Sequence, residues 1–337
     1  MTSKKQSLSQ ENGVQGEPGF PMIEFTFLLQ NLIIPNSRPW KLTDLNILCR
    51  VCPLLKGHLS HKVPCLNWVL AGADQIVEYL ISRNRIDDPA LYFKEGCQAG
   101  HVSIAILLYP LLNKKSISKY EIMDMFVNNC MNCHLDMAKW LYSTFNITLE
   151  NVKKECIFRL SCEFGHIEVI QWLCDIAHIT PKEAKMNNNQ AFILSCENGH
   201  LNVSQWLYNT FHITREEATI HDNLAFRSSC VNGHLMVAQW LCENFCITPT
   251  EAKANNNEAF KLSCINGHLS VARWLHDIFH ITSDEAKMSN NEAFISSCGE
   301  GHLEIAQWLH DTFHMTSEDA KMDDNREIGR ASCRERV

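Results

Sequence analysis

Short blocks of apolar residues recur along most of this chain with a period of 34 residues. In one block, Ala259, Phe260 and Leu262 lie on one face of a helix-like segment that runs from 258 to 264. The segment from 269 to 279 then places Val271 and Leu275 at the i, i+4 spacing of a second helix. The pattern therefore predicts two amphipathic, antiparallel helices in each block.

A glycine-histidine pair separates the two predicted helices. Glycine suits the left-handed backbone that ends a helix, because it has no Cβ atom, so the chain can turn sharply there. A diverged copy at Cys133-His134 and a weaker one near Gly72 extend the series to about eight units. The clear pairs are Gly100-His101, Gly165-His166, Gly199-His200, Gly233-His234, Gly267-His268 and Gly301-His302.

A third, shorter helix is predicted between consecutive blocks. In four connecting segments a threonine precedes a glutamate by three residues, which is the spacing of a capping box. Pro181 and Pro249 stand at the first helical position, where proline is favoured. The pairs are Thr180 and Glu183, Thr214 and Glu217, Thr248 and Glu251, and Thr282 and Glu285.

One such unit cannot bury its apolar side alone, so its stability must come from stacking against its neighbours. Hydrophobic residues form 45% of the chain and charged residues 20%, a composition typical of folded proteins. We therefore expect an all-α repeat solenoid.

Over residues 66–325 the blocks resemble ankyrin repeats. Ser195-Cys196 stands where that family has paired alanines, Gly199-His200 matches its Gly-His, and Trp206-Leu207 matches its Leu-Leu. The family's Thr-Pro-Leu-His opening is replaced by residues 190–193, and its Gly-Ala-Asp hairpin by residues 211–214. We therefore expect short capped helical linkers in place of most β-hairpins.

The tryptophan in the second helix and the Ile-Thr-x-x-Glu-Ala-Lys linker resemble ankyrin repeats of giant DNA viruses and protists. Tetratricopeptide units share the 34-residue period but lack the Gly-His turn, so we rank them well below the ankyrin type.

The ankyrin resemblance implies a non-enzymatic scaffold or adaptor that binds a partner protein on the concave face of the array. Residues that vary between otherwise similar repeats are candidate contacts, and four of them share one position: Ile193, Arg227, Lys261 and Ile295. The chain has neither a phosphate-binding glycine loop nor a nucleophile elbow, so we expect no catalytic residues and no cofactor.

Net charge and composition indicate which classes of partner and which cellular location to expect. The net charge is −8 without a long basic stretch, which argues against nucleic acid. The apolar segment 104–112 is too short to cross a bilayer and contains Pro110. Residues 1–19 are polar, which predicts a disordered lead-in rather than a secretory signal. With no such signal, the sixteen cysteines predict reduced thiols in an intracellular, cytoplasmic protein.

Three sets of side chains, each at one equivalent position of successive repeats and here called a column, have both a structural and a functional interpretation. Cys-x3-His pairs such as Cys196 and His200 could form metal sites, but we favour a core cysteine and a turn histidine. A histidine series after the second helix (His178, His212, His280 and His314) gives way to Asn146 and Cys246, which favours a polar turn position. For the tryptophan column we favour packing over a binding stripe: Trp140, Trp172, Trp206, Trp240, Trp274 and Trp308.

Residues 20–65 precede the repeats and predict a helical cap that shields the first unit. They also faintly resemble an F-box, which would make the protein a substrate receptor of a ubiquitin ligase. The same segment holds a possible zinc ligand set, although the spacing equally suits an ordinary helix. Its members are Cys49, Cys52, His58, His61 and Cys65.

The C-terminal residues 326–337 are expected to be non-native. Residues 327–337, EIGRASCRERV, resemble a translated sequencing-adaptor read-through, and residues 321–325 before them match the start of a further repeat. On this hypothesis the native protein is longer, and the repeats could be the targeting region of an enzyme whose catalytic domain is missing.

Overall fold

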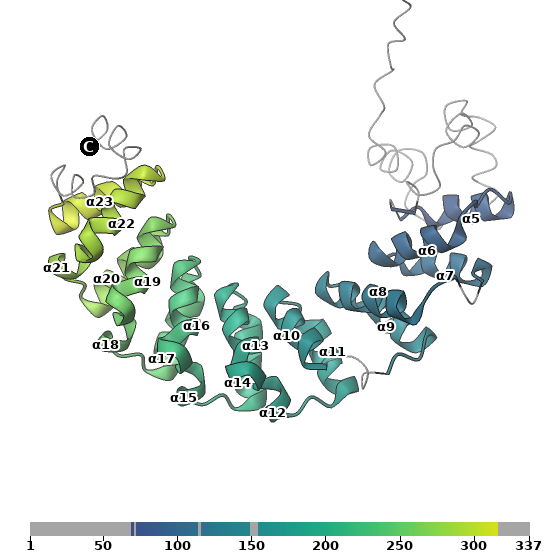
Figure 1. The fold of residues 1–337 in the computed structure, drawn as a ribbon, viewed down its shortest axis with the longest axis horizontal. Helices are drawn as coiled ribbons and strands as arrows, with labels where there is room; N and C mark the ends of the chain where they lie inside the picture. The colour runs from purple at the N-terminus through teal and green to yellow at the C-terminus, as the bar shows by residue number, and fades with distance from the viewer. Residues whose placement is uncertain (1–68, 71, 114–115, 149–153, 316–337) are drawn as a thin grey trace, which may run out of the picture. The chain divides into compact units, whose positions relative to one another are not determined.

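The computed structural model describes residues 69–70, 72–113, 116–148 and 154–315 (Figure 1). The chain divides into two compact units, residues 1–121 and 122–337, which we describe separately. Every regular element among the described residues is a helix, which confirms the all-α prediction. The expectations for residues 1–19, 20–65 and 326–337 fall outside the described residues and stay predictions.

In the first unit, two antiparallel helices, α6 (Pro89–Gln98) and α7 (Val102–Leu108), are joined by the turn at Gly100, which has φ 77°. Pro89 opens the first of them, and the Asp88 carboxylate accepts a hydrogen bond from the Leu91 backbone N–H at 3.0 Å. Phe93 and Ile104 are fully buried between the two helices. The elements are α5 (Asp74–Ser82), α6 (Pro89–Gln98), α7 (Val102–Leu108) and the 3-10 turn η1 (Tyr109–Leu111), and α8 (Lys119–Met131) crosses into the second unit.

The second unit continues with helix pairs in which a longer first helix and a second helix lie antiparallel. The first helices are α10 (Lys154–Phe164), α13 (Met186–Glu197), α16 (Ile220–Val231), α19 (Ala254–Ile265) and α22 (Met288–Gly299). The second helices are α9 (Leu135–Thr144), α11 (Ile167–Ala177), α14 (Leu201–Phe211), α17 (Leu235–Phe245), α20 (Leu269–Phe279) and α23 (Leu303–Phe313).

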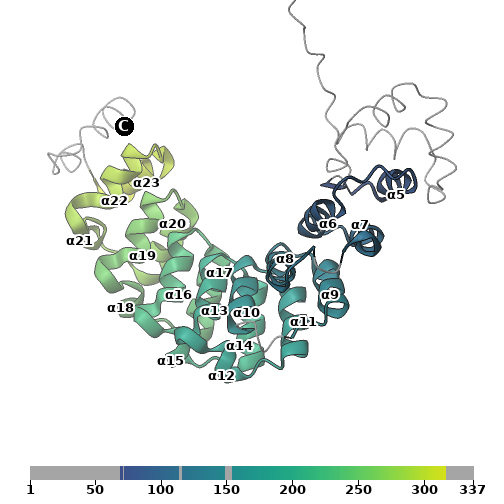
Figure 2. The ribbon, with the colours of Figure 1, turned by 45° about the vertical axis from the view of Figure 1, so that its right-hand side comes forward.

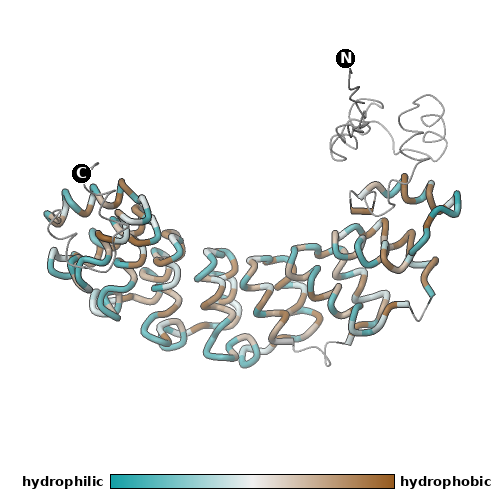
Figure 3. Tube along the Cα trace, turned by 45° about the horizontal axis from the view of Figure 1, so that its top comes forward, coloured by the Kyte–Doolittle hydropathy of each residue, from teal (hydrophilic) through white to brown (hydrophobic). Residues whose placement is uncertain are grey.

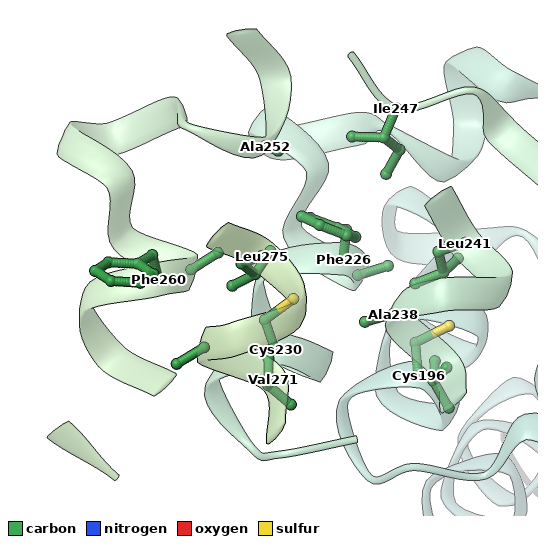
Figure 4. Close-up of a cluster of buried hydrophobic side chains, with 14 of the residues drawn as sticks. Cys196, Phe226, Cys230, Ala238, Leu241, Ile247, Ala252, Phe260, Val271 and Leu275 are labelled. Atoms are coloured by element: carbon green, nitrogen blue, oxygen red, sulfur yellow. The ribbon is translucent and has the colours of Figure 1, made fainter. Parts of the chain in front are cut away.

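Consecutive first helices pack directly against one another because small residues face the junction. Ser297 of α22 donates a hydrogen bond to the Cys264 carbonyl of α19 at 3.1 Å, which requires close approach of the two backbones. The core runs without a break from repeat to repeat, whereas the turns are hydrophilic (Figure 3). Figure 4 shows part of it, with Phe226, Cys230, Leu241, Phe260 and Leu275.

The predicted third helices are present as single turns with complete capping boxes. Thr180, for example, accepts a hydrogen bond from the Glu183 N–H, and the Glu183 carboxylate accepts one from the Thr180 N–H at 2.9 Å. These short helices lie along the outer edge of the second unit (Figure 2). They are α12 (Pro181–Ala184), α15 (Arg215–Ala218), α18 (Pro249–Ala252) and α21 (Ser283–Ala286).

The residue after α11, α14, α17, α20 and α23 adopts the left-handed conformation, as at His212 with φ 52° and Cys246 with φ 50°. This finding accounts for the second histidine series as turn positions. Among the described residues no strand replaces the capped linkers, so the predicted loss of the β-hairpins is confirmed there.

Candidate protein-interaction surface

The boundary between repeats is built around the glycine-histidine pairs. A Cβ atom added to Gly233 would lie 2.5 Å from the His268 Nδ1 atom, and one added to Gly199 would lie 2.4 Å from the His234 Nδ1 atom. The histidine of one repeat thus packs on the glycine of the repeat before it. Glycine is required twice, for its positive φ and for the space that the ring occupies.

The same histidines bind the backbone of the preceding repeat. The His200 Nε2–H donates to the Glu163 carbonyl at 3.0 Å, and the His166 Nε2–H donates to the Met131 carbonyl at 2.8 Å. Burial lowers the pKa of the His200 and His234 imidazoles, and neighbouring imidazoles of the series lower both further. A neutral ring that donates through Nε2 is therefore the favoured state.

The cysteine column is part of the core. Cys196 is fully buried, its thiol lies 3.4 Å from the Ser204 hydroxyl, and burial raises its pKa to about 12. Such a thiol is a poor nucleophile and a poor metal ligand, since both roles need the thiolate. Among the residues that the structure describes, no group of three or more histidine, cysteine or acidic side chains is arranged to hold a metal ion.

The tryptophan column joins neighbouring repeats while leaving each indole half-buried. The Trp274 ring lies 6.2 Å from Phe226 of the preceding repeat and 5.8 Å from Phe279 of its own helix, measured between ring centroids. The same triad recurs one repeat earlier and one repeat later. These contacts support the packing interpretation, and the partly exposed rings line the second helices.

An ion-pair series links the short third helices. The Lys185 ammonium lies 2.7 Å from the Glu217 carboxylate and donates to the His212 carbonyl at 3.1 Å. Lys253 does the same toward Glu285 in a later repeat, at 2.8 Å. Each of these lysines therefore links the C-terminal end of one short helix to the capping-box glutamate of the next short helix.

One repeat lacks the linker lysine and compensates for it. Thr219 takes the lysine position, and Arg215, at the start of the same short helix, reaches the Glu251 carboxylate instead at 2.9 Å. Burial opposes ionisation of Glu251, yet the hydrogen bonds from Thr248 and Arg215 keep its pKa below the usual range.

The four variable positions suggested as contacts differ in exposure. Ile193 is 5% exposed, whereas Arg227, Lys261 and Ile295 are half-buried. The Arg227 guanidinium lies 3.1 Å from Glu258 of the next repeat, and the Lys261 ammonium lies 3.0 Å from Glu292.

The same two positions hold the apolar pair Ile193 and Leu224 one repeat earlier. The residue type at the position of Ile193, Arg227 and Lys261 therefore matches that of its neighbour in the next repeat: a basic residue faces glutamate, and isoleucine faces leucine. This is a structural reason for the variation that does not involve a partner.

The left-handed turn at the start of α13, α16, α19 and α22 was not predicted from the sequence. Asn255, Asn256 and Asn257 all have φ between 55° and 59° and ψ between 39° and 48°, and the equivalent residues of the other linkers match them. Asparagine tolerates this region better than most residues because its short side chain bonds locally. The signal was present as the Asn-rich triplets at 187–189, 255–257 and 289–291.

The first helices leave one row of half-exposed side chains between the ion pairs, which we term the first-helix surface. Its members are Leu160, Leu194, Ser228, Val231, Leu262, Ile265 and Ser296. The basic side chains Arg227 and Lys261 beside it are paired with glutamates. The row itself combines aliphatic side chains with two serines, and Glu163 and Glu197 take the position of Val231 in α10 and α13. The zinc candidates at 49–65 lie outside the described residues.

Comparison with known proteins agrees with this architecture over part of the chain. Residues 126–217 match the family model for ankyrin repeats, in three copies, and such repeats are generally protein-protein interaction modules. No curated protein matches the chain. Among the described residues, no helix has both the length and the apolar character needed to cross a membrane.

Proposed function

We propose that this protein is a non-enzymatic adaptor that binds a partner protein on the first-helix surface. The observation that carries the proposal is a set of partly exposed aliphatic side chains on consecutive first helices: Leu160, Leu194, Val231, Leu262 and Ile265. Ion pairs between neighbouring first helices flank them at Arg227 and Lys261. Interfaces gain most of their energy from such a desolvated centre with a polar rim.

The first helices lie on the inner side of the second unit in Figure 1. Small serine and cysteine residues let consecutive first helices approach closely, as the Ser297 to Cys264 hydrogen bond shows. A surface that curves inward can contact a partner from several repeats at once, so that modest contacts add up.

A selection experiment tests this function. A displayed peptide library is panned against the full chain, and the recovered ligands are measured against two variants. The paired substitution Leu194→Asp and Leu262→Asp should weaken binding at least about tenfold, because it places charge in the apolar centre.

The matched control carries Asn202→Asp and Gln307→Asp, which are exposed on second helices. Binding that falls in the control and not in the first variant would place the interface on the other side of the array. The column of Ile193, Arg227, Lys261 and Ile295 borders the proposed centre, and alanine variants of its members test its share of the binding energy.

The described cysteines other than Cys298 are free thiols, and most of them are buried. This supports an intracellular location, where thiols stay reduced.

A further inference from the structure

α7 and the turn η1 that follows it expose apolar side chains on the side that faces away from the core. Ile106 is 51% exposed and Leu111 is 42% exposed, and Pro110 beside them is exposed as well. The positions of Ile106 and Pro110 are polar or charged in the six later repeats. At the Ile106 position these residues are Lys139, Gln171, Gln205, Gln239, Arg273 and Gln307.

Exposed apolar side chains on neighbouring turns are costly in water and indicate a surface that something covers. Since each of the later repeats keeps these positions polar, the apolar character of α7 is not a demand of the repeat fold. It is specific to this unit, which is the first one with a complete helix pair among the described residues.

A segment of the same chain could cover the exposed apolar side chains of α7 and η1. The described part of the first unit begins at Val69, and a Cβ on Gly96 would lie 3.3 Å from the Val69 side chain and 3.1 Å from that of Ile104. Val69 therefore packs on α6 together with Ile104, which faces the buried side of α7, and the 68 residues that precede Val69 are tethered to this unit.

That preceding stretch contains a strongly apolar segment. Residues 22–34, MIEFTFLLQNLII, include a single charged residue, Glu24. About 35 residues separate Ile34 from Val69, and a random coil of that length spans about 30–35 Å. A tethered segment acts at an effective concentration of about a millimolar or more, so a small apolar contact is sufficient.

We propose that residues 22–34 dock on the outer side of α7, on the patch formed by Ile106, Pro110 and Leu111. The segment then shields the apolar helix of the first complete repeat, and the contact is intramolecular. This inference is independent of the partner surface on the first helices of the second unit.

Hydrogen exchange of the full chain tests the docking. In the unaltered protein, the amides of residues 22–34 should exchange slowly. In the variant Ile106→Gln with Leu111→Thr, their exchange should be at least about tenfold faster, because both replacements are residues that later repeats carry at these positions. The single variant Leu111→Thr gives a smaller change of the same sign.

The matched control is Ile278→Thr. Ile278 is 50% exposed and occupies the same repeat position as Leu111, on α20 of the second unit. Its replacement should leave the exchange of residues 22–34 unchanged. Unchanged exchange of the second unit in all variants shows that the repeats remain folded.

Two outcomes overturn the proposal. One is exchange of residues 22–34 that is fast in the unaltered protein or identical in all variants. The other is a dimer mass by light scattering that becomes monomeric in the Ile106→Gln, Leu111→Thr variant, because the cover is then a second copy of the chain.

Discussion

The glycine of each turn meets two independent demands, and one substitution separates them. Gly233→Ala should cost about 1–2 kcal/mol for its left-handed backbone and about 1–3 kcal/mol more for the clash with the His268 ring. Gly301 has the same φ of 81° as Gly233, but no described atom lies within 4 Å of the place that a Cβ atom would take there. Gly301→Ala should therefore show the backbone cost alone. Urea denaturation of both variants measures the difference, and equal losses would show that the ring contact is unimportant.

The buried histidines predict how stability depends on pH. The pKa of His200, His234 and His268 lies below the ordinary value of 6.5 in the folded chain, because burial disfavours the charged ring. The unfolded chain then takes up protons first as the pH falls through 6.5, so the free energy of unfolding should decrease from pH 7 to pH 5.5. Denaturant titrations at the two pH values measure this change.

The variant His234→Gln should lose less of its free energy of unfolding between pH 7 and pH 5.5, because it lacks one of the imidazoles whose pKa is lowered in the folded chain. His212→Asn is the control, since His212 is exposed and Asn146 stands at the equivalent position. The capping-box glutamate Glu285 does not interfere with this measurement. Burial opposes ionisation of Glu285, but Lys253 and Thr282 keep its pKa below 4.5, so its contribution is lost only at lower pH. A steeper pH dependence in His234→Gln would contradict the assignment.

At the scale of elements, the left-handed turn at the start of α13, α16, α19 and α22 is the least expected feature. Three consecutive non-glycine residues in this region each carry a backbone cost of about 1–2 kcal/mol for most side chains. Asn256 is exposed with φ 57°, so its side chain has no part in the core. Asn256→Ala should lower the free energy of unfolding by about 1 kcal/mol, because alanine tolerates the left-handed backbone less well than asparagine.

Asn256→Gly is the matched variant, and it should be neutral or slightly stabilising because glycine has no steric penalty at positive φ. Thermal unfolding of both proteins provides the comparison. A glycine variant as unstable as the alanine variant would show that the asparagine side chain, rather than the backbone, holds the turn.

For the second unit as a whole, stability is divided between the repeats and the contacts that join them. Trp274 joins two repeats through Phe226 and Phe279, so Trp274→Ala should cost about 2–4 kcal/mol. The substitution weakens the contact between the repeat of Phe226 and the repeat of Trp274. We therefore expect the denaturation curve to separate into two transitions. Arg273→Ala, on the same helix and exposed, should leave one transition. A single transition shifted in Trp274→Ala would mean that the junction is held mainly by other contacts.

Much of this architecture could be predicted because its signals are local. The helix pairs follow from apolar spacing within about twelve residues, and the capped linkers follow from a threonine and a glutamate three positions apart. The glycine of each turn is likewise predicted by its own backbone conformation. The left-handed turns were missed although their signal is also local, because three such residues in succession rarely occur.

Contacts between repeats could be decided only by the tertiary structure. The His200 ring meets the Glu163 carbonyl 37 residues away, and Lys185 meets Glu217 32 residues away. No local propensity determines such distances, because they depend on how closely the first helices approach and how each unit rotates on the last. The sequence by itself determined the unit and its repetition. The packing of one unit on the next determined the other features. It places each histidine on the glycine of the preceding repeat, sets which charged side chains pair, and leaves certain side chains on the surface for a partner.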